Sequence, residues 1–426
     1  MDDLFDVTSI FVSRLRSKSR CPVLCAVHRP WGGCSWLLGQ CFLGSASGQY
    51  IWFMNTGLLL ERQEGGVARF ERWSYSIDMS AEHSPQRIIH SVAPIRICDN
   101  GGWTDTWFAE HGTIFNIGVY PCAEVEIQIF EIGDVDDRIV IHAENYGERF
   151  AVAPVGGDWT HHPLLEAAVE YMEVPDDAFE LTIYCDAPAG CSTGTSAAVT
   201  VAVIGALDML SPGRMTPYEV ALTAQKIETE MLGQQCGIQD QLCSAFGGIN
   251  YIEMFQYPHA SVSQIQVNNS IWWELERRLV LIFLGKAHSS SAVHEKVIAE
   301  LEGAGPDNPK LDALRRTAPA SRDAVYAGDF VGLGQAMIDN TEAQARLHPD
   351  LVGTDAQMVI DLARAHGALG WKVNGAGGDG GSLTLLTGDL SWQKRELVRA
   401  IEAASPGFQS LPIYLSRHGL RLWEAA

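Results

Sequence analysis

A glycine-rich segment joins an apolar stretch to an almost wholly apolar helix near the middle of this chain. The apolar stretch covers residues 181–184, the segment covers residues 188–198 (PAGCSTGTSAA), and the helix is predicted over residues 196–210. Because that helix has no polar face, it must be buried on most sides, which requires layers of structure around it. Glycines allow the loop to turn its N–H groups inward, and a helix N-terminus adds positive potential, so the segment favours an anion site.

Two hydroxyl side chains, Thr195 and Ser196, lie where this helix is expected to begin, and a hydroxyl in that position can bind Mg²⁺. The simpler interpretation is a flexible turn whose Ser and Thr cap the helix. The segment is not a Walker loop, because the sequence lacks G-x4-G-K-[ST]. Taken alone, the segment leaves both interpretations open.

Two further segments concentrate glycine. In residues 93–105 (APIRICDNGGWTD), a short strand is expected to deliver Arg96 and a tight turn to present Asp105. A carboxylate on such a turn can accept hydrogen bonds from two adjacent sugar hydroxyls, whereas the simpler interpretation is a solvated Asp on a β-turn. In residues 370–382 (GWKVNGAGGDGGS), the glycines imply backbone packed closely against a ligand or another chain segment.

The charge balance excludes one class of partner. Asp and Glu outnumber Lys and Arg by 52 to 30, for a formal net charge of −22. This excess opposes nucleic-acid binding, since phosphate backbones are bound by clustered Lys and Arg. It does not oppose a substrate with phosphate groups, because a few local donors or Mg²⁺ can reverse the field within one cleft.

Ten cysteines in 426 residues are too few for a disulfide scaffold, so we expect a protein of the reducing cytoplasm. Cys21, Cys25, Cys34 and Cys41 cluster around His28, but their C-x3-C spacing differs from that of zinc ribbons, and buried free thiols are favoured over a metal site. No apolar run reaches the ~18 residues of a membrane span, and no signal peptide is evident. We therefore expect a soluble protein without a membrane partner.

Strand and helix patterns mix along the chain without regular βαβ alternation, which favours an α+β fold over a doubly wound sheet. Residues 1–88 are rich in Trp and in short apolar runs such as 50–54, and a β-rich extension is expected there. Strands are predicted at 123–130, 139–142, 181–184, 279–284 and 382–387. Helices are predicted at 163–172, 196–210, 217–232, 291–302, 309–327, 329–347 and 354–367.

Taken together, the three glycine segments resemble those of the GHMP kinases (galactokinase, homoserine kinase, mevalonate kinase and phosphomevalonate kinase), and they occur in the family's order. Residues 93–105 are similar to the galactokinase signature, residues 188–198 to the phosphate loop P-x-G-x-G-L-G-S-S-A, and residues 375–381 to the closing glycine motif. The stretches GGWTD at 101–105, QDQ at 239–241 and AFGG at 245–248 most resemble the heptose kinase and fucokinase branch.

The resemblance spans roughly residues 90–390 and implies a two-domain α+β GHMP kinase fold with ATP in the cleft between the domains. It implies a ribosomal protein S5 domain 2-like N-terminal domain at 89–268 and a ferredoxin-like C-terminal domain at 269–426. Residues 1–88 would precede both as an extension without an assigned role.

The resemblance also assigns roles by position. Asp240 would be the catalytic carboxylate, with Arg96 beside it, and Ser196 and Glu228 would bind Mg²⁺. The sugar would contact Gly102, Trp103, Thr104 and Asp105. The phosphates of ATP would contact Gly190, Cys191, Ser192, Thr193, Gly194, Thr195, Ser196, Gly377 and Gly378. This set agrees with the chemistry, since phosphoryl transfer requires a phosphate cradle, a metal ion and an oriented hydroxyl. The simpler alternative is a structural Arg96–Asp240 ion pair and a solvated Glu228.

The activity that the resemblance implies is ATP- and Mg²⁺-dependent phosphorylation of a small-molecule sugar, at the anomeric C1 hydroxyl of a heptose, a heptose phosphate or a fucose-like sugar. A homodimer is compatible with it. Two alternatives stay open: a GHMP kinase for a non-sugar alcohol, and a catalytically silent sugar- or nucleotide-binding regulator on the same scaffold.

The regulator hypothesis comes from departures from the family pattern. Ser192 and Thr193 replace Gly and Leu of the phosphate loop, so a different loop path is expected if a positive φ is required there. Asp379 places a negative charge in the third glycine segment, which is unfavourable near ATP unless the side chain faces away. Trp103 replaces a commoner residue of the sugar turn and can stack on a sugar face.

Overall fold

The computed structural model describes residues 23–28, 34–39, 41–46, 49–54, 57–61, 69–73, 84–153, 155–211, 214–287 and 292–425. Before residue 84, and at residues 292 and 293, it describes the backbone without the side chains. The chain divides into two compact units, residues 1–82 and 83–426.

The described segments of the first unit are all strands. Four of them pair antiparallel in the order β1 (Val23–His28), β2 (Cys34–Gly39), β5 (Gly57–Glu61) and β6 (Arg69–Trp73). The other two, β3 (Cys41–Ala46) and β4 (Gln49–Met54), form a hairpin. The β-rich expectation is confirmed for these segments, whereas the side chains of the cysteine cluster around residue 28 lie outside the described part of the chain.

The second unit is built on a large mixed sheet. Its central strands are β7 (Arg87–Asn100) and β8 (Gly112–Phe130), which pair antiparallel along most of their length. The sheet is completed by β9 (Ile139–Ala143), β10 (Glu148–Ala151), β11 (Ala178–Cys185), β12 (Ile249–Gln256), β13 (His259–Gln264), β18 (Tyr414–Leu415) and β19 (Arg421–Glu424). The ladder of β7 is irregular between Pro94 and Ile95 and again between Ile97 and Asn100. Such bulges bend a strand and redirect its side chains, and Arg96 lies between the two.

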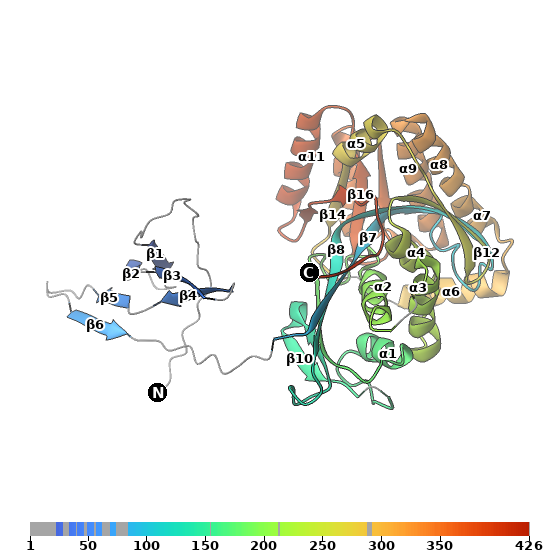
Figure 1. Cartoon of the computed structure of the whole chain (residues 1–426). Coiled ribbons are helices and arrows are strands. Elements are labelled where there is room, and N and C mark those ends of the chain that lie inside the picture. Colours follow the sequence, from blue (N-terminus) through green and yellow to red (C-terminus); the bar gives the residue numbers. More distant parts are fainter. Residues whose placement is uncertain are drawn as a thin grey trace. The chain divides into compact units, whose positions relative to one another are not determined.

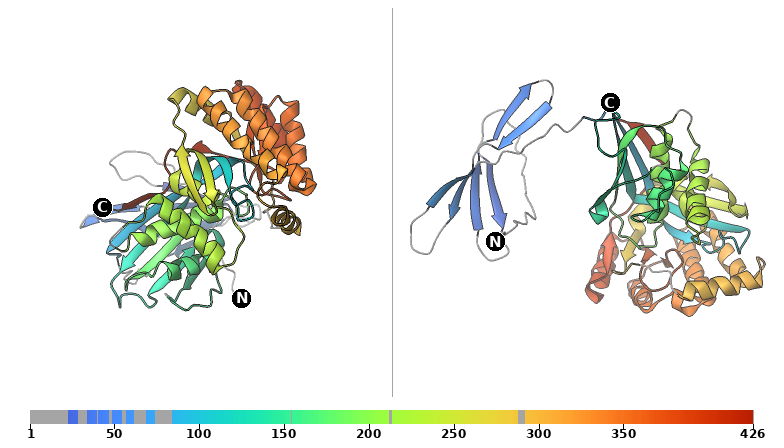
Figure 2. Two further views of the ribbon diagram at one scale, coloured as in Figure 1. Left: turned by 90° about the vertical axis from the view of Figure 1, so that its right-hand side faces the viewer. Right: turned by 90° about the horizontal axis from the view of Figure 1, so that it is seen from below.

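Four helices gather beside β7 and β8, as Figures 1 and 2 show in green. They are α1 (Pro163–Tyr171), α2 (Thr195–Asp208), α3 (Pro217–Lys226) and α4 (Gln239–Phe246). Helix α2 contacts β7, β8 and the other three helices. Its burial on most sides is therefore confirmed.

The C-terminal half of the unit contains a second sheet, ordered β15 (Gly370–Val373), β16 (Ser382–Leu386), β14 (Leu279–Phe283) and β17 (Gln409–Leu411). The remaining helices are α5 (Asn269–Arg278), α6 (Ala292–Ala304), α7 (Pro309–Arg315), α8 (Thr317–Ala327), α9 (Phe330–Leu347), α10 (Thr354–Ala365) and α11 (Ser391–Ala404). The apolar cluster around β7 and α2 extends to Trp272, Leu275 and Leu279, so the two predicted kinase domains share core residues. The boundary between residues 268 and 269 stays a prediction.

The predicted α+β class is confirmed, and the structure changes several predicted elements. The strand that carries Arg96 is not short but has 14 residues. The helix predicted at 309–327 is two helices, α7 and α8, and the one predicted at 217–232 ends in a π-helical turn, η2 (Ile227–Met231). The sequence analysis did not predict α4, α5 or α11. Within the described residues, no helix is both long and apolar enough to cross a membrane.

Candidate active site

Arg96 and Asp240 form a buried, two-pronged ion pair. The Nε and Nη2 of Arg96 donate to Oδ1 and Oδ2 of Asp240 at 2.7 Å and 3.1 Å. Arg96 is 4% exposed, whereas the side chain of Asp240 is 27% exposed. Burial alone lowers the pKa of Arg96, but the charges of Asp240 and Asp99 outweigh it and raise the pKa above its usual value. The pair thus leaves a partly accessible carboxylate fixed by a permanent cation.

A second buried ion pair, which the sequence analysis missed, lies behind this one. Lys372 on β15 places Nζ 3.3 Å from Oδ1 of Asp99, and both side chains are essentially inaccessible. The other end of Asp99 accepts the backbone N–H of Gly375 at 3.0 Å. Burial lowers the pKa of Lys372, and Asp99 opposes that shift. Both residues belong to the glycine segments already noted, but only their contact across the fold reveals the pairing.

The loop before α2 wraps around Arg96. The Nη1 of Arg96 donates to the carbonyl of Ser192, and its backbone N–H donates to the carbonyl of Thr193 at 2.9 Å. Ser192 has a φ of 59°, next to Gly190 at 69° and Gly194 at 68°. Instead of avoiding the left-handed conformation, Ser192 adopts it, at a strain of about 1–2 kcal/mol.

Gly194 brings the loop into direct contact with the pair. A Cβ placed on Gly194 would lie 3.0 Å from Oδ2 and 3.2 Å from Cβ of Asp240. Substituting Gly194→Ala should therefore displace Asp240 and lower kcat at least about tenfold, in addition to the strain of a positive φ. The matched control is Gly367→Ala, where φ is 70° but nothing lies within 4 Å of the added methyl group. Equal kcat values for Gly194→Ala and the control would show that the close contact between Gly194 and Asp240 does not affect turnover.

Two cavities meet at the start of α2. A large cavity of about 880 Å³ contains Arg96, Asp240 and Glu228, and a smaller loop cavity of about 440 Å³ contains Gly190 and Thr195. Ser196 lines both cavities. The N-terminus of α2 and its hydroxyl side chain thus lie between two spaces, each large enough for a small molecule.

Glu228 enters the large cavity from the π-helical turn that ends α3, a distortion often found at functional sites. It is 4% exposed, and its Oε2 accepts from Nε2 of Gln241 at 3.1 Å, while Oε1 is buried without a hydrogen-bond partner. Burial raises the pKa of Glu228 to about 7, and Asp240 adds to the shift. An unpartnered carboxylate oxygen facing a cavity that also holds a Ser hydroxyl fits a divalent cation. Within the described residues, no group of three His, Cys, Asp or Glu could hold a metal alone, so phosphate or water oxygens would have to complete such a shell.

Three comparisons, with a family model, with known sequences and with solved structures, identify proteins similar to this chain. Residues 163–248 match the model of the GHMP kinases N terminal domain. The mevalonate kinase of Thermococcus sibiricus is 31% identical over 252 residues, which cover 57% of this chain and 68% of that protein. The chain belongs to the GHMP kinase family.

Other relatives within the family are sugar kinases by name. The D-glycero-alpha-D-manno-heptose 7-phosphate kinase of Campylobacter jejuni is 29% identical over 203 residues, 48% of this chain and 60% of that protein. The match thus spans three fifths of that relative's length. The crystal structure of a D-glycero-D-manno-heptose 1-phosphate kinase from Bacteriodes thetaiotaomicron shares the fold, with a TM-score of 0.61, 24% identity, and coverage of 79% of this chain and 98% of that one.

In this GHMP kinase, the residues of the turn predicted to hold a sugar have two different roles. Thr104 is buried and donates its hydroxyl to the carbonyl of Gly101 at 2.7 Å, and Gly102 packs against Asp99, so both shape the turn. Trp103 and Asp105 line the large cavity. Trp103 is held at a φ of 73°, stacks on His294 and leaves its Nε1 buried without a partner. Such strain in a bulky residue is typical of functional sites.

Asp105 is tied to the helix that carries Asp240. Its Oδ2 accepts the backbone N–H groups of Ile238 and Gln239, both at 3.1 Å, so it caps the start of α4 from another segment. A Cβ on Gly237 would lie 1.9 Å from the same oxygen, which explains the glycine there. Asp105 therefore positions Asp240, and its remaining oxygen, Oδ1, faces Nε2 of Gln239 at 3.4 Å.

The buried carboxyl of Asp105 makes stability depend on pH. Burial raises its pKa from 3.8 to about 6, so the folded state binds the proton more tightly and the free energy of unfolding falls as the pH rises from about 4 to above 6. In Asp105→Asn, the free energy of unfolding should no longer fall over this pH range. At pH 8 it should exceed the wild-type value by on the order of 2 kcal/mol. Urea unfolding at pH 4.5, 6 and 8 measures it. Asp176→Asn, at a side chain 88% exposed, is the control, and a wild-type profile for Asp105→Asn would contradict the shift.

The remaining predicted residues of this GHMP kinase do not line either cavity. Cys191 is buried, and its backbone carbonyl accepts from the hydroxyl of Ser382 at 2.6 Å. The carbonyls of Ser192 and Thr193 accept from Arg96, and Gly194 packs against Asp240. Gly377 and Gly378 pack against the carbonyl of Leu351, so their contact with ATP stays a prediction. Asp379 is 78% exposed to solvent and lies 4.0 Å from Lys286.

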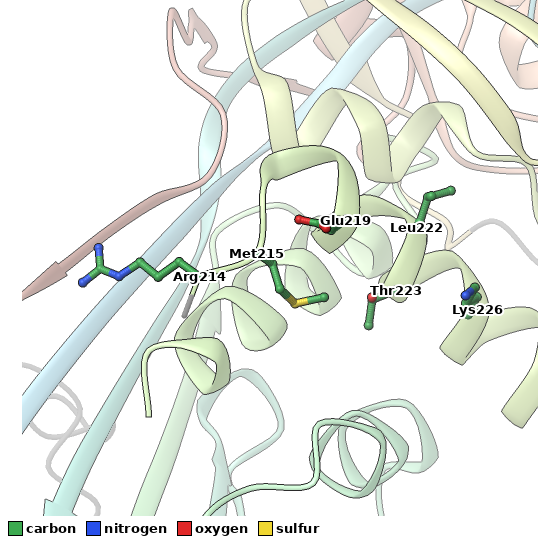
Figure 3. Close-up of a pocket in the computed structure, with 6 residues that line it drawn as sticks. All are labelled: Arg214, Met215, Glu219, Leu222, Thr223 and Lys226. Atoms are coloured by element: carbon green, nitrogen blue, oxygen red, sulfur yellow. The ribbon is translucent and has the colours of Figure 1, made fainter. Parts of the chain in front are cut away.

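A separate depression lies along α3, lined by Arg214, Met215, Glu219, Leu222, Thr223 and Lys226 (Figure 3). The carboxylate of Glu219 closes a capping box with Thr216 at the start of the helix. No predicted site residue lines this depression, so its chemistry is separate from that of the Arg96–Asp240 pair.

Proposed function

We propose that this GHMP kinase transfers the γ-phosphoryl group of ATP to a sugar hydroxyl, at the anomeric C1 position of a heptose, a heptose phosphate or a fucose-like sugar. The observation that carries the proposal is that Ser196 lines both cavities, while the Arg96–Asp240 pair lines the larger one. A nucleotide in the loop cavity would direct its terminal phosphate toward an acceptor in the large cavity.

The proposed nucleotide site binds phosphate through backbone N–H groups. The loop cavity is lined by Gly190 and by Thr195 and Ser196 at the first turn of α2. The first N–H groups of a 14-residue helix have no intrahelical partner and attract phosphate oxygens. This arrangement supports binding of the triphosphate without a lysine in the loop, as the lack of a Walker motif requires.

The acceptor side uses the carboxylate. Asp240 would orient the sugar hydroxyl and accept its proton as the hydroxyl oxygen bonds to phosphorus and the bond from phosphorus to the ADP oxygen breaks. Arg96, bound through Nε and Nη2, holds Asp240 in one orientation and offsets negative charge near the transferring group. Trp103 offers a ring face on which a sugar can stack.

Glu228 and Ser196 are the side chains that fit Mg²⁺, because Oε1 of Glu228 is buried without a partner and both residues line the large cavity. When bound, Mg²⁺ would neutralise charge on the phosphate oxygens. Glu228 is held for this role by Nε2 of Gln241.

The test is ATP consumption by the full chain with a panel of hexoses, heptoses, heptose phosphates, mevalonate and homoserine, followed by phosphorus NMR of the product. Turnover of a sugar, with coupling between phosphorus and the anomeric proton, is the expected result. Turnover only with mevalonate or homoserine would show that the acceptor is a non-sugar alcohol and not a sugar. Binding of nucleotide or sugar without any turnover would favour the silent regulator.

A further inference from the structure

The large cavity is strongly acidic. Five carboxylates line it, from Asp99, Asp105, Glu228, Asp240 and Glu295; Asp99 is paired with Lys372 and Asp240 with Arg96, which leaves three without an ion-pair partner in the described lining. Of the described residues in its lining, Arg96 is the only lysine or arginine, and its guanidinium is already bound by Asp240 and the carbonyl of Ser192. When ATP and Mg²⁺ occupy the N-terminus of α2 and Glu228, an acceptor in this space would meet the carboxylates of Asp105 and Glu295 and no free lysine or arginine of the described lining.

Neither the neighbouring histidine nor the start of α4 supplies a free positive charge for the acceptor. His294 lines the cavity, but burial lowers its pKa below the usual value, which disfavours its charged form. The first N–H groups at the start of α4, those of Ile238 and Gln239, already donate to Asp105.

A phosphate ester is poorly matched to such a lining. It carries a charge of about −1.5 to −2 at pH 7 and is bound in proteins by Arg, Lys or free helix N-termini. Placing it among the carboxylates of this cavity would add like-charge repulsion to the loss of its hydration.

The same lining is well matched to neutral hydroxyl groups. Carboxylates accept hydrogen bonds from hydroxyls, and the side chains of Gln234, Gln235, Gln239 and Gln241 offer both donors and acceptors. Four polar atoms of the lining residues are buried without partners: Nε1 of Trp103 and the Oε1 atoms of Glu228, Gln239 and Gln241. Rings of Trp103, Trp107 and Phe108 add apolar faces of the kind on which the C–H face of a sugar packs.

We infer that the acceptor of this enzyme is an uncharged polyhydroxy compound, a sugar without a phosphate ester, and that the acidic lining of the large cavity excludes phosphorylated sugars. The inference rests on the proposed function, because it takes the large cavity as the acceptor site. It separates this chain from the relatives that are named for heptose phosphates.

The first test compares each free sugar with its own terminal phosphate ester in steady-state kinetics: D-glycero-D-manno-heptose with its 7-phosphate, and mannose with mannose 6-phosphate. We expect kcat/KM for the better free sugar to exceed that of its ester by at least about 100-fold. An ester used as well as, or better than, its free sugar would overturn the inference.

Binding without ATP separates this inference from the proposed function. Isothermal titration of the wild-type protein with the same pairs should show binding of the free sugar and none of its ester. If that selectivity is found but no sugar is phosphorylated, the kinase proposal fails while the inference stands. Binding of the esters, or of neither member of any pair, would overturn the inference.

A charge reversal tests whether the acidic lining causes the preference for the free sugar. Glu295 on α6 is exposed at the large cavity, and Glu295→Lys should narrow the preference for the free sugar at least about tenfold by providing a cation for the ester. Glu300→Lys on the same helix lies outside the lining and breaks only an exposed contact with Lys310, so it should leave the ratio unchanged. Equal ratios in both variants and the wild type would show that the charge of the lining does not set the preference.

Discussion

Replacing Asp240 by Asn is expected to lower kcat by about 10² or more, with a smaller change in the affinity for ATP. The amide keeps the size of the side chain and can still accept from Nε of Arg96, but it cannot take up the proton of an acceptor hydroxyl. Since Asp240 contacts Gly194 of the loop and lines the large cavity, the loss should concentrate in the chemical step.

Coupled measurement of ADP release, together with nucleotide binding by titration, checks this expectation. Asp379→Asn is the matched control, because that carboxylate is 78% exposed and lines neither cavity. Retained binding with lost turnover would support the role of Asp240. Turnover by Asp240→Asn within a few-fold of the control would remove the central assignment and leave the Arg96–Asp240 pair as a structural contact.

The second large effect is on stability. Arg96→Met should reduce the free energy of unfolding by about 3–5 kcal/mol, because it leaves Asp240 without its partner and the carbonyl of Ser192 without a donor, and it removes one of the two cations near Asp99. Turnover should be lost as well, since no group would hold Asp240 in place.

Urea unfolding of Arg96→Met beside Arg87→Met tests the difference between a buried and an exposed pair. Arg87 and Glu424 are 40% and 43% exposed, so that control should lose less than about 1 kcal/mol. Adding Asp240→Asn to Arg96→Met should recover part of the loss, because one uncompensated charge is removed. Equal losses in the two single variants would show that the buried pair contributes no more than a surface contact.

The candidate site could be predicted where its residues belong to local motifs. Four of the predicted residues lie in short motifs whose chemistry can be inferred from the sequence: Arg96, Ser196, Glu228 and Asp240. The structure brings all four to the large cavity. Asp99 and Lys372 could not be paired in advance, because a lysine and an aspartate 273 positions apart show nothing of their 3.3 Å contact.

Helix α4 shows why some elements escaped prediction. It has eight residues, too short for a clear periodic pattern, and its N-cap, Ile238, supplies no capping side chain. The cap comes instead from Asp105, 133 positions earlier in the chain than Ile238. Sequence patterns detect caps only when the capping residue is adjacent to its helix.

The sequence by itself determined the α+β class, the burial of the helix after residue 194 and the three glycine segments, because these follow from local hydrophobic periodicity and backbone freedom. Only the tertiary structure decided what each polar group in those segments does. It tied Asp105 to α4, turned Cys191 inward and Asp379 outward, and placed Ser196 between two cavities. The physical reason is that the role of a polar side chain depends on the partners within about 3 Å of it, and here those partners come from distant parts of the chain.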